Sequence, residues 1–150
     1  MNYNETGGPV LAEWWQRLVA RIIDGLILGC LGNFTGLGTF RRSTNSVGSA
    51  SFGFNGVGFF GAIVVGLLYY GLMHGLKGQT LGKMALGIKV VQKGTDTKLE
   101  MGPAFIRAGV DALLWATCIG GILDGLWPLW DKDRQAIHDK AGNSQVMKAR

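Results

Sequence analysis

The longest stretch without a charged side chain limits most strongly what this chain can fold into. Residues 43–76 contain no aspartate, glutamate, lysine or arginine. A run of this length is difficult to place in a soluble domain of 150 residues. Its most apolar part, about residues 53–76, exceeds the roughly 20 residues that an α-helix needs to cross a hydrocarbon core. We therefore expect a membrane span there.

Two further apolar segments lie at about residues 18–40 and 104–130. Tryptophan favours the membrane–water boundary, and tryptophan pairs stand at the outer ends of these two segments. The pairs are Trp14 with Trp15 and Trp127 with Trp130. The sequence thus predicts an all-α membrane protein with three hydrophobic segments, folded as a single domain over residues 1–150.

The distribution of lysine and arginine bears on the path of the third segment. If all three segments cross straight, eight basic residues fall on one side and seven on the other. If the third turns back near residues 119–121, the count becomes thirteen against two, which agrees with the positive-inside rule. This favours a re-entrant hairpin with both termini in the cytoplasm, while a straight span remains the alternative.

The connection at residues 77–103 is expected on the cytoplasmic side. Its sequence GIKVVQ-KGTD-TKLE predicts a short β-hairpin after an amphipathic QTLGKMAL stretch. Residues 78–83 resemble a phosphate-binding loop but lack its leading glycine and its Ser/Thr, which argues against nucleotide binding. We expect the basic residues here and in the basic tail to meet anionic lipid headgroups, and we expect no nucleic-acid partner.

Charged residues within the hydrophobic segments are costly, so they should face protein or water. Arg17, Arg21 and Asp24 share one helix face, where Arg21 and Asp24 can pair. Arg107 and Asp111 repeat the arrangement, and Asp124 follows a glycine pair. An ion or proton site and a structural ion pair are both open interpretations. The candidates for an ion or proton site are Arg17, Arg21, Asp24, Asp111 and Asp124.

Other chemistry has no support in the residue spacing. The two cysteines and two histidines lack the spacing of metal ligands. No nucleophile–base pattern is present either. We therefore expect no metal, no cofactor and no enzymatic activity.

Glycine spacing in the first segment predicts a close helix contact. A small-residue stripe of this kind lets two helix backbones approach. The contact can lie within the chain or with another molecule. The stripe consists of Gly25, Gly29, Gly32 and Gly36.

Three blocks in order, WWQRLVARIIDGLIL, GQTLGKMALGIKVV and DKDRQAIHDKAGN, resemble the RDD family of bacterial membrane proteins. The resemblance spans about residues 12–147 and implies a multi-pass protein of the inner membrane. It implies that Arg17 and Asp24 are the family's arginine and first aspartate. The second aspartate falls at Asp139, with Asp131 as the alternative.

The resemblance also implies a function. A transport role has been proposed for the family, including cation/proton exchange by some members. We expect either small-cation/proton transport by an oligomer, or a non-catalytic accessory subunit packed against a larger membrane protein complex.

Overall fold

The computed structural model describes residues 10–34, 40–44, 50–117 and 119–149, and side chains are described for all of these except 40–44, 50–52 and 54. The chain is mostly helical. In order, its elements are α1 (Trp14–Phe34), β1 (Phe40–Thr44), β2 (Ala50–Phe54), α2 (Gly56–Lys77), α3 (Leu81–Ala85), β3 (Ile88–Gln92), α4 (Met101–Ala116), α5 (Ile119–Leu126), the 3-10 turn η1 (Trp127–Leu129), α6 (Ile137–Ala141) and β4 (Ser144–Lys148).

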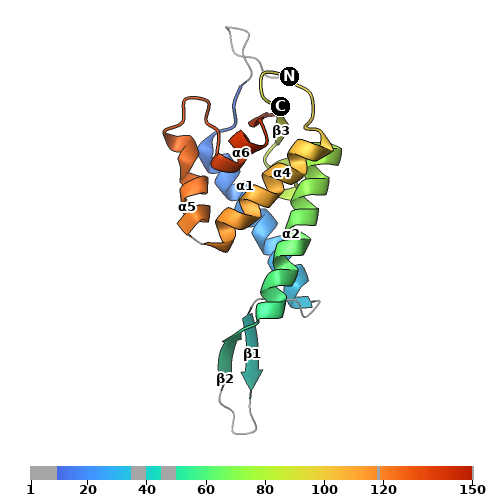
Figure 1. Cartoon of the computed structure of the whole chain (residues 1–150), viewed down its shortest axis with the longest axis vertical. Helices are drawn as coiled ribbons and strands as arrows, with labels where there is room; N and C mark the ends of the chain where they lie inside the picture. The colour runs from blue at the N-terminus through green and yellow to red at the C-terminus, as the bar shows by residue number, and fades with distance from the viewer. Residues whose placement is uncertain (1–9, 35–39, 45–49, 118, 150) are drawn as a thin grey trace.

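Most of the helices pack against α4, which crosses the front of the molecule (Figure 1). α2 runs along α4, α3 packs on α1, and both α5 and α6 contact α4. The antiparallel ribbon of β1 and β2 projects from the end of α2 that lies farthest from β3. This ribbon was not expected, because residues 41–52 carry little apolar alternation.

α2 confirms the second predicted segment. It is 22 residues long, and within the described part of the chain it is the one helix long and apolar enough to cross a membrane. Its C-terminus is closed by Gly78, whose φ of 68° lets its N–H bond the His74 carbonyl. α1 is nearly as long but includes three charged side chains; it is described as far as Phe34, and residues 35–39 of the predicted segment lie outside the described residues. A protein with three full spans is therefore not confirmed.

The third predicted segment is two helices rather than one. α4 ends at Ala116, and the chain reverses through Thr117, whose hydroxyl donates to the Leu114 carbonyl (2.7 Å) and accepts from the Gly120 N–H (3.2 Å). The reversal thus precedes the glycine pair that was expected to form it. Because α4 and α5 have 16 and 8 residues, neither reaches the roughly 20 residues of a span. The chain path is that of a hairpin, and its place in the membrane stays a prediction.

The first strand of the predicted β-hairpin forms, but it pairs with a strand of the tail rather than with the next segment of the chain. β3 pairs antiparallel with β4 from the tail, from Ile88 opposite Lys148 to Gln92 opposite Ser144. The expected return strand contributes one bridge, between Val91 and Lys98. The tail is therefore an integral part of the fold, a long-range pairing that local sequence patterns do not reveal.

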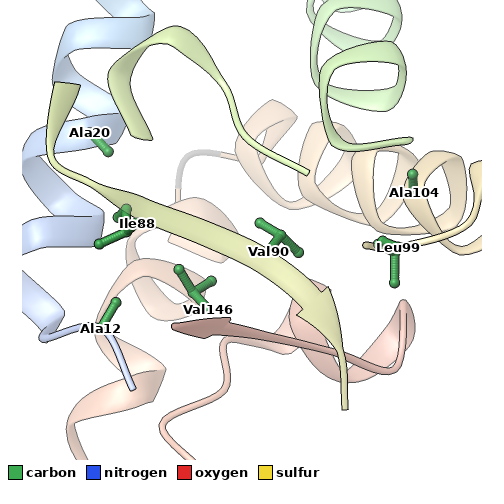
Figure 2. Close-up of a cluster of buried hydrophobic side chains, with 7 residues drawn as sticks. All are labelled: Ala12, Ala20, Ile88, Val90, Leu99, Ala104 and Val146. Carbon is green, nitrogen blue, oxygen red and sulfur yellow. The ribbon is translucent and has the colours of Figure 1, made fainter. Parts of the chain in front are cut away.

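A small apolar core lies on this sheet (Figure 2). It consists of Ala12, Ala20, Ile88, Val90, Leu99, Ala104 and Val146, all at most 1% exposed. The N–H of Ala12 bonds the Val146 carbonyl at 2.9 Å, so the segment before α1 is held to the tail as well. The core fixes α1, α4 and the sheet relative to one another.

Outside this core, the usual distribution of polar and apolar side chains is inverted. Leu113 and Ile119 are 71% and 72% exposed on the helix surfaces, whereas Asp124 and Arg107 are 0% and 3% exposed. In water, charged residues are almost never buried to this degree unless paired, and broad apolar surfaces mark contact sites. A helix surface that is apolar outside and charged inside suits a hydrocarbon environment.

Two glycines of the stripe, Gly25 and Gly29, have open space beside them in the described part of the chain. A Cβ added at Gly25 or Gly29 would meet nothing within 4 Å. Both residues and Gly32 instead line a groove of about 790 Å³ between α1, α2 and α4. Gly36 lies outside the described residues. A contact with another molecule remains a prediction.

Candidate functional site

The five candidate residues all line one cavity of about 330 Å³, bounded mainly by α1, α4 and α5. Val146 of β4 also lines the cavity, which therefore adjoins the β3–β4 sheet. The charged residues and histidines of the lining are Arg17, Arg21, Asp24, His74, Lys83, Arg107, Asp111, Asp124 and His138. Six separate helices therefore bring together groups that lie up to 121 positions apart in the sequence.

Arg21 is the centre of one half of this lining. Its guanidinium bonds Asp111 through Nη2 and lies 3.4 Å from Asp124 Oδ2 through Nη1. It also lies over the ring of Trp115, 5.1 Å from the ring centroid. The expected pair of Arg21 with Asp24 does not form, because the carboxylates of α4 and α5 take up the guanidinium.

His138 of α6 joins Arg107 to the same carboxylates. Arg107 Nη2 lies 3.0 Å from His138 Nε2, and a guanidinium can only donate, so Nε2 accepts. The proton of the neutral ring is therefore on Nδ1, which donates to Asp124 Oδ2 at 2.5 Å. The His138 N–H donates to the other oxygen of Asp124 at 3.0 Å. Asp124 thereby fixes both the position and the tautomer of this histidine.

Asp139 holds the other two arginines. Arg17 Nη1 lies 3.0 Å from its Oδ2, and Arg107 bonds its Oδ1. The predicted i, i+4 pair of Arg107 with Asp111 is therefore wrong. Burial alone would raise the pKa of Asp139, but the guanidinium groups of Arg107 and Arg17 outweigh it and hold that pKa well below its usual range.

Asp24, the first candidate by sequence, makes no ion pair with any described residue. Its oxygens accept hydrogen bonds from the Tyr69 hydroxyl (2.8 Å), the Thr80 hydroxyl (2.6 Å) and the Gly82 N–H (2.8 Å). These donors come from α2, the turn after it, and α3. Asp24 therefore connects α1 to the segment that follows α2.

Two ionisable residues of the cavity were missed by the sequence interpretation. Lys83 was expected at lipid headgroups, but it is buried together with His74, and its Nζ lies 2.8 Å from His74 Nε2. Burial, together with the charge of Arg107, lowers the pKa of Lys83 well below its ordinary value. No sequence signal identifies the pair, since the eight intervening residues include a helix end and a turn.

A cation could be held by three of these groups. Asp111, Asp124 and His138 present ligand atoms that all lie within 4.8 Å of one another. Arg21 already bonds both carboxylates, and Nδ1 of His138 donates toward Asp124. A cation entering here must therefore replace the guanidinium as the positive partner of the two carboxylates.

The sequence matches the RDD family over residues 11–143. The chain belongs to the RDD family. It is 27% identical to a protein of Bacillus subtilis (strain 168) named "Uncharacterized membrane protein YteJ", over 96% of this chain and 90% of that protein. It is 35% identical to the "Proline-rich antigen" of Mycobacterium leprae (strain TN), over 47% of this chain and 27% of that protein. No solved structure matches significantly.

In this RDD family protein, the arginine and the two alternative second aspartates occupy distinct places. Arg17 contacts Asp139, which is 1% exposed. Asp131 instead bonds Lys140 at the surface and accepts from the Gln135 N–H at 2.9 Å. Of the two alternatives, Asp139 is the one that meets the arginine.

Proposed function

We propose that this protein exchanges a small cation for protons across the membrane, working as an oligomer. One observation carries the proposal: two buried carboxylates from different helices converge on a single guanidinium at the wall of a cavity. Asp111 and Asp124 share one directly bonded cation, the guanidinium of Arg21. In a low-dielectric site a carboxylate binds a cation or a proton in competition.

Arg21 is suited to be the group that a cation displaces. Its guanidinium already lies over the Trp115 ring, and a cation–π contact there is worth about 0.5–2 kcal/mol. After leaving the carboxylates, Arg21 would retain that contact. An oligomer is proposed because the described part of the chain contains a single helix that is long and apolar enough to span, too few to surround a pathway.

The test is cation-driven proton movement in liposomes that contain the purified protein and a pH-sensitive dye. Addition of Na⁺, K⁺ or Li⁺ should move protons, and Asp124→Asn should abolish the response. Asp133→Asn is the matched control, because its side chain is 50% exposed and pairs with Lys93 at the surface. Absence of flux from well-folded wild-type protein would contradict the transport proposal.

We further propose the topology that the charge distribution favours: a bacterial plasma-membrane protein with the tail on the cytoplasmic side. The exposed residues Gly53 and Lys132 serve as reporters. In a background without the native cysteines, cysteine at position 53 should react with an impermeant thiol reagent in intact cells, and cysteine at 132 should not. Reaction of both would mean that the α4–α5 hairpin passes through the membrane.

The accessory-subunit alternative has its own supporting observation, the open groove of about 790 Å³ beside Gly25 and Gly29. A partner helix packed there would be excluded by Gly29→Leu. Gly109→Leu on α4 is the control, since an added Cβ at Gly109 also meets nothing within 4 Å and Gly109 does not line the groove. Crosslinking in native membranes should lose a heterologous partner only in the first variant. If both variants keep the same partners, this groove is not the docking site.

A further inference from the structure

We propose that His74 and Lys83 form a proton-binding site that holds a single proton charge and releases it when a cation enters the adjoining cavity. The cation step rests on the transport function proposed above, whereas the proton site itself does not. Neither residue belongs to the ion network of Arg21 or to that of Asp139.

Lys83 differs from every other cation of the cavity lining. Among the described residues it makes no ion pair, while Arg17, Arg21 and Arg107 each bond at least one carboxylate. Its side chain is buried, and the hydrogen-bond partner of its Nζ is Nε2 of His74 at 2.8 Å. A buried ammonium without a carboxylate is strongly disfavoured, so the amine is predisposed to lose its proton.

The distance between the two nitrogens limits the pair to one positive charge. A protonated lysine can only donate, so Nε2 must then be the acceptor, and the ring must be neutral. An imidazolium facing an ammonium would place two donors 2.8 Å apart. His74 Nδ1 is buried and makes no hydrogen bond of good geometry with the described residues. The backbone of Tyr70 favours a proton on the ring, but the neighbouring charge of Lys83 opposes a second one more strongly.

The charged groups packed around Lys83 balance only when it is protonated. Arg107 and Arg21 oppose its charge, while Asp139 and Asp24 favour it, and His138 lies near His74. With a neutral His138, the four cations Arg17, Arg21, Lys83 and Arg107 match the four carboxylates Asp24, Asp111, Asp124 and Asp139. Burial prevails in this set and lowers the pKa of Lys83 well below its ordinary value of 10.5.

Loss of the lysine proton leaves the site with one excess negative charge. The N–H bond breaks, the electron pair stays on Nζ as a neutral amine, and the proton passes to water. An alkali cation entering between Asp111 and Asp124 restores the balance. One proton leaves for each monovalent cation bound, and no net charge accumulates in the protein.

The experiment uses the full-length protein in nanodiscs, with NaCl added against choline chloride as the control salt. A pH dye should report release of about one proton per bound Na⁺ near neutral pH, as charge balance requires. Lys83→Met, which removes the titrating amine and keeps an unbranched side chain, should lose at least nine-tenths of this release. Lys77→Met at the exposed end of α2 is the matched control and should release as the wild type does.

A second measurement does not depend on cation binding or on a variant. ¹⁵N NMR of the wild-type protein labelled at lysine follows the protonation of Lys83 directly. Proton loss near neutral pH without any effect of Na⁺ would support the proton site and contradict the transport function. Undiminished release from Lys83→Met, or an ammonium that persists to pH 10, would overturn the proton site.

Discussion

Replacement of Asp139 by asparagine is the sharpest test of the ion network. The carboxylate is 1% exposed, bonds both Arg17 and Arg107, and accepts the Ala136 N–H at 3.1 Å. Asparagine has nearly the same shape, so packing is retained while the negative charge is lost. Removing one partner of a buried ion pair costs about 3–5 kcal/mol, because the remaining charge stays buried without compensation. Two arginines are affected here, so we expect the upper part of that range.

The assay is thermal unfolding in detergent micelles, followed by intrinsic tryptophan fluorescence. For a chain of this size the expected loss lowers the midpoint by on the order of 10 °C. Asp131→Asn is the control, since Asp131 pairs with a half-exposed lysine, and such surface pairs contribute about 0–1 kcal/mol. Equal shifts of the unfolding midpoint in the two variants would refute this expectation, because they would show that the buried carboxylate of Asp139 contributes no more to stability than the carboxylate of Asp131 at the surface.

Three further outcomes are expected from the same assay. The ion pairs of Asp139 should contribute their full stability above pH 3.8, the ordinary pKa of its carboxyl. That contribution should be lost as the pH falls from 3.8 toward the lowered pKa of Asp139 in the folded protein, and Asp139→Asn should not show this pH-dependent loss. Gly82→Ala should cost about 1–3 kcal/mol, because the new Cβ meets a backbone carbonyl of α1 that cannot move aside, whereas Gly109→Ala should cost nothing. Thr80→Val should cost about 1–3 kcal/mol by removing a hydroxyl that donates to a buried carboxylate of α1 at 2.6 Å, while exposed Thr95→Val should change stability by less than about 0.5 kcal/mol.

Composition and periodicity predicted the elements that depend on local sequence. The apolar run at 53–76 became α2 almost residue for residue, and the third segment reversed as the lysine and arginine count favoured. The charged residues singled out from the sequence all line one cavity, because a charge in an apolar segment must face protein or water; their role as an ion or proton site stays a prediction. What the sequence could not supply was the pairing among them. Helix spacing suggested partners three or four positions away, such as Arg21 with Asp24.

The structure pairs these residues over much longer distances. Arg21 meets Asp111 and Asp124, which lie 90 and 103 positions away, and Arg17 meets Asp139 across 122. Partners three or four positions away on the same helix were present in the sequence. When helices enclose a cavity, however, a side chain that faces the cavity reaches residues of the facing helices more easily than residues of its own helix. β3 likewise pairs over a long distance, with β4 of the tail rather than with the adjacent segment that was expected to return along it.

Because the charged side chains lie inside and the apolar ones outside, the tail is essential to the site even though it follows the last hydrophobic segment. In a bilayer, apolar burial contributes little to holding helices together, so specific polar contacts and close packing must do so. His138 and Asp139 of α6 contribute to both halves of the network: one is fixed by Asp124, and the other neutralises Arg17 and Arg107. Without α6, two buried arginines would lack a carboxylate. The tail therefore completes the charge balance of the cavity, and a cation or proton that alters that balance acts on the contacts that hold the helices together.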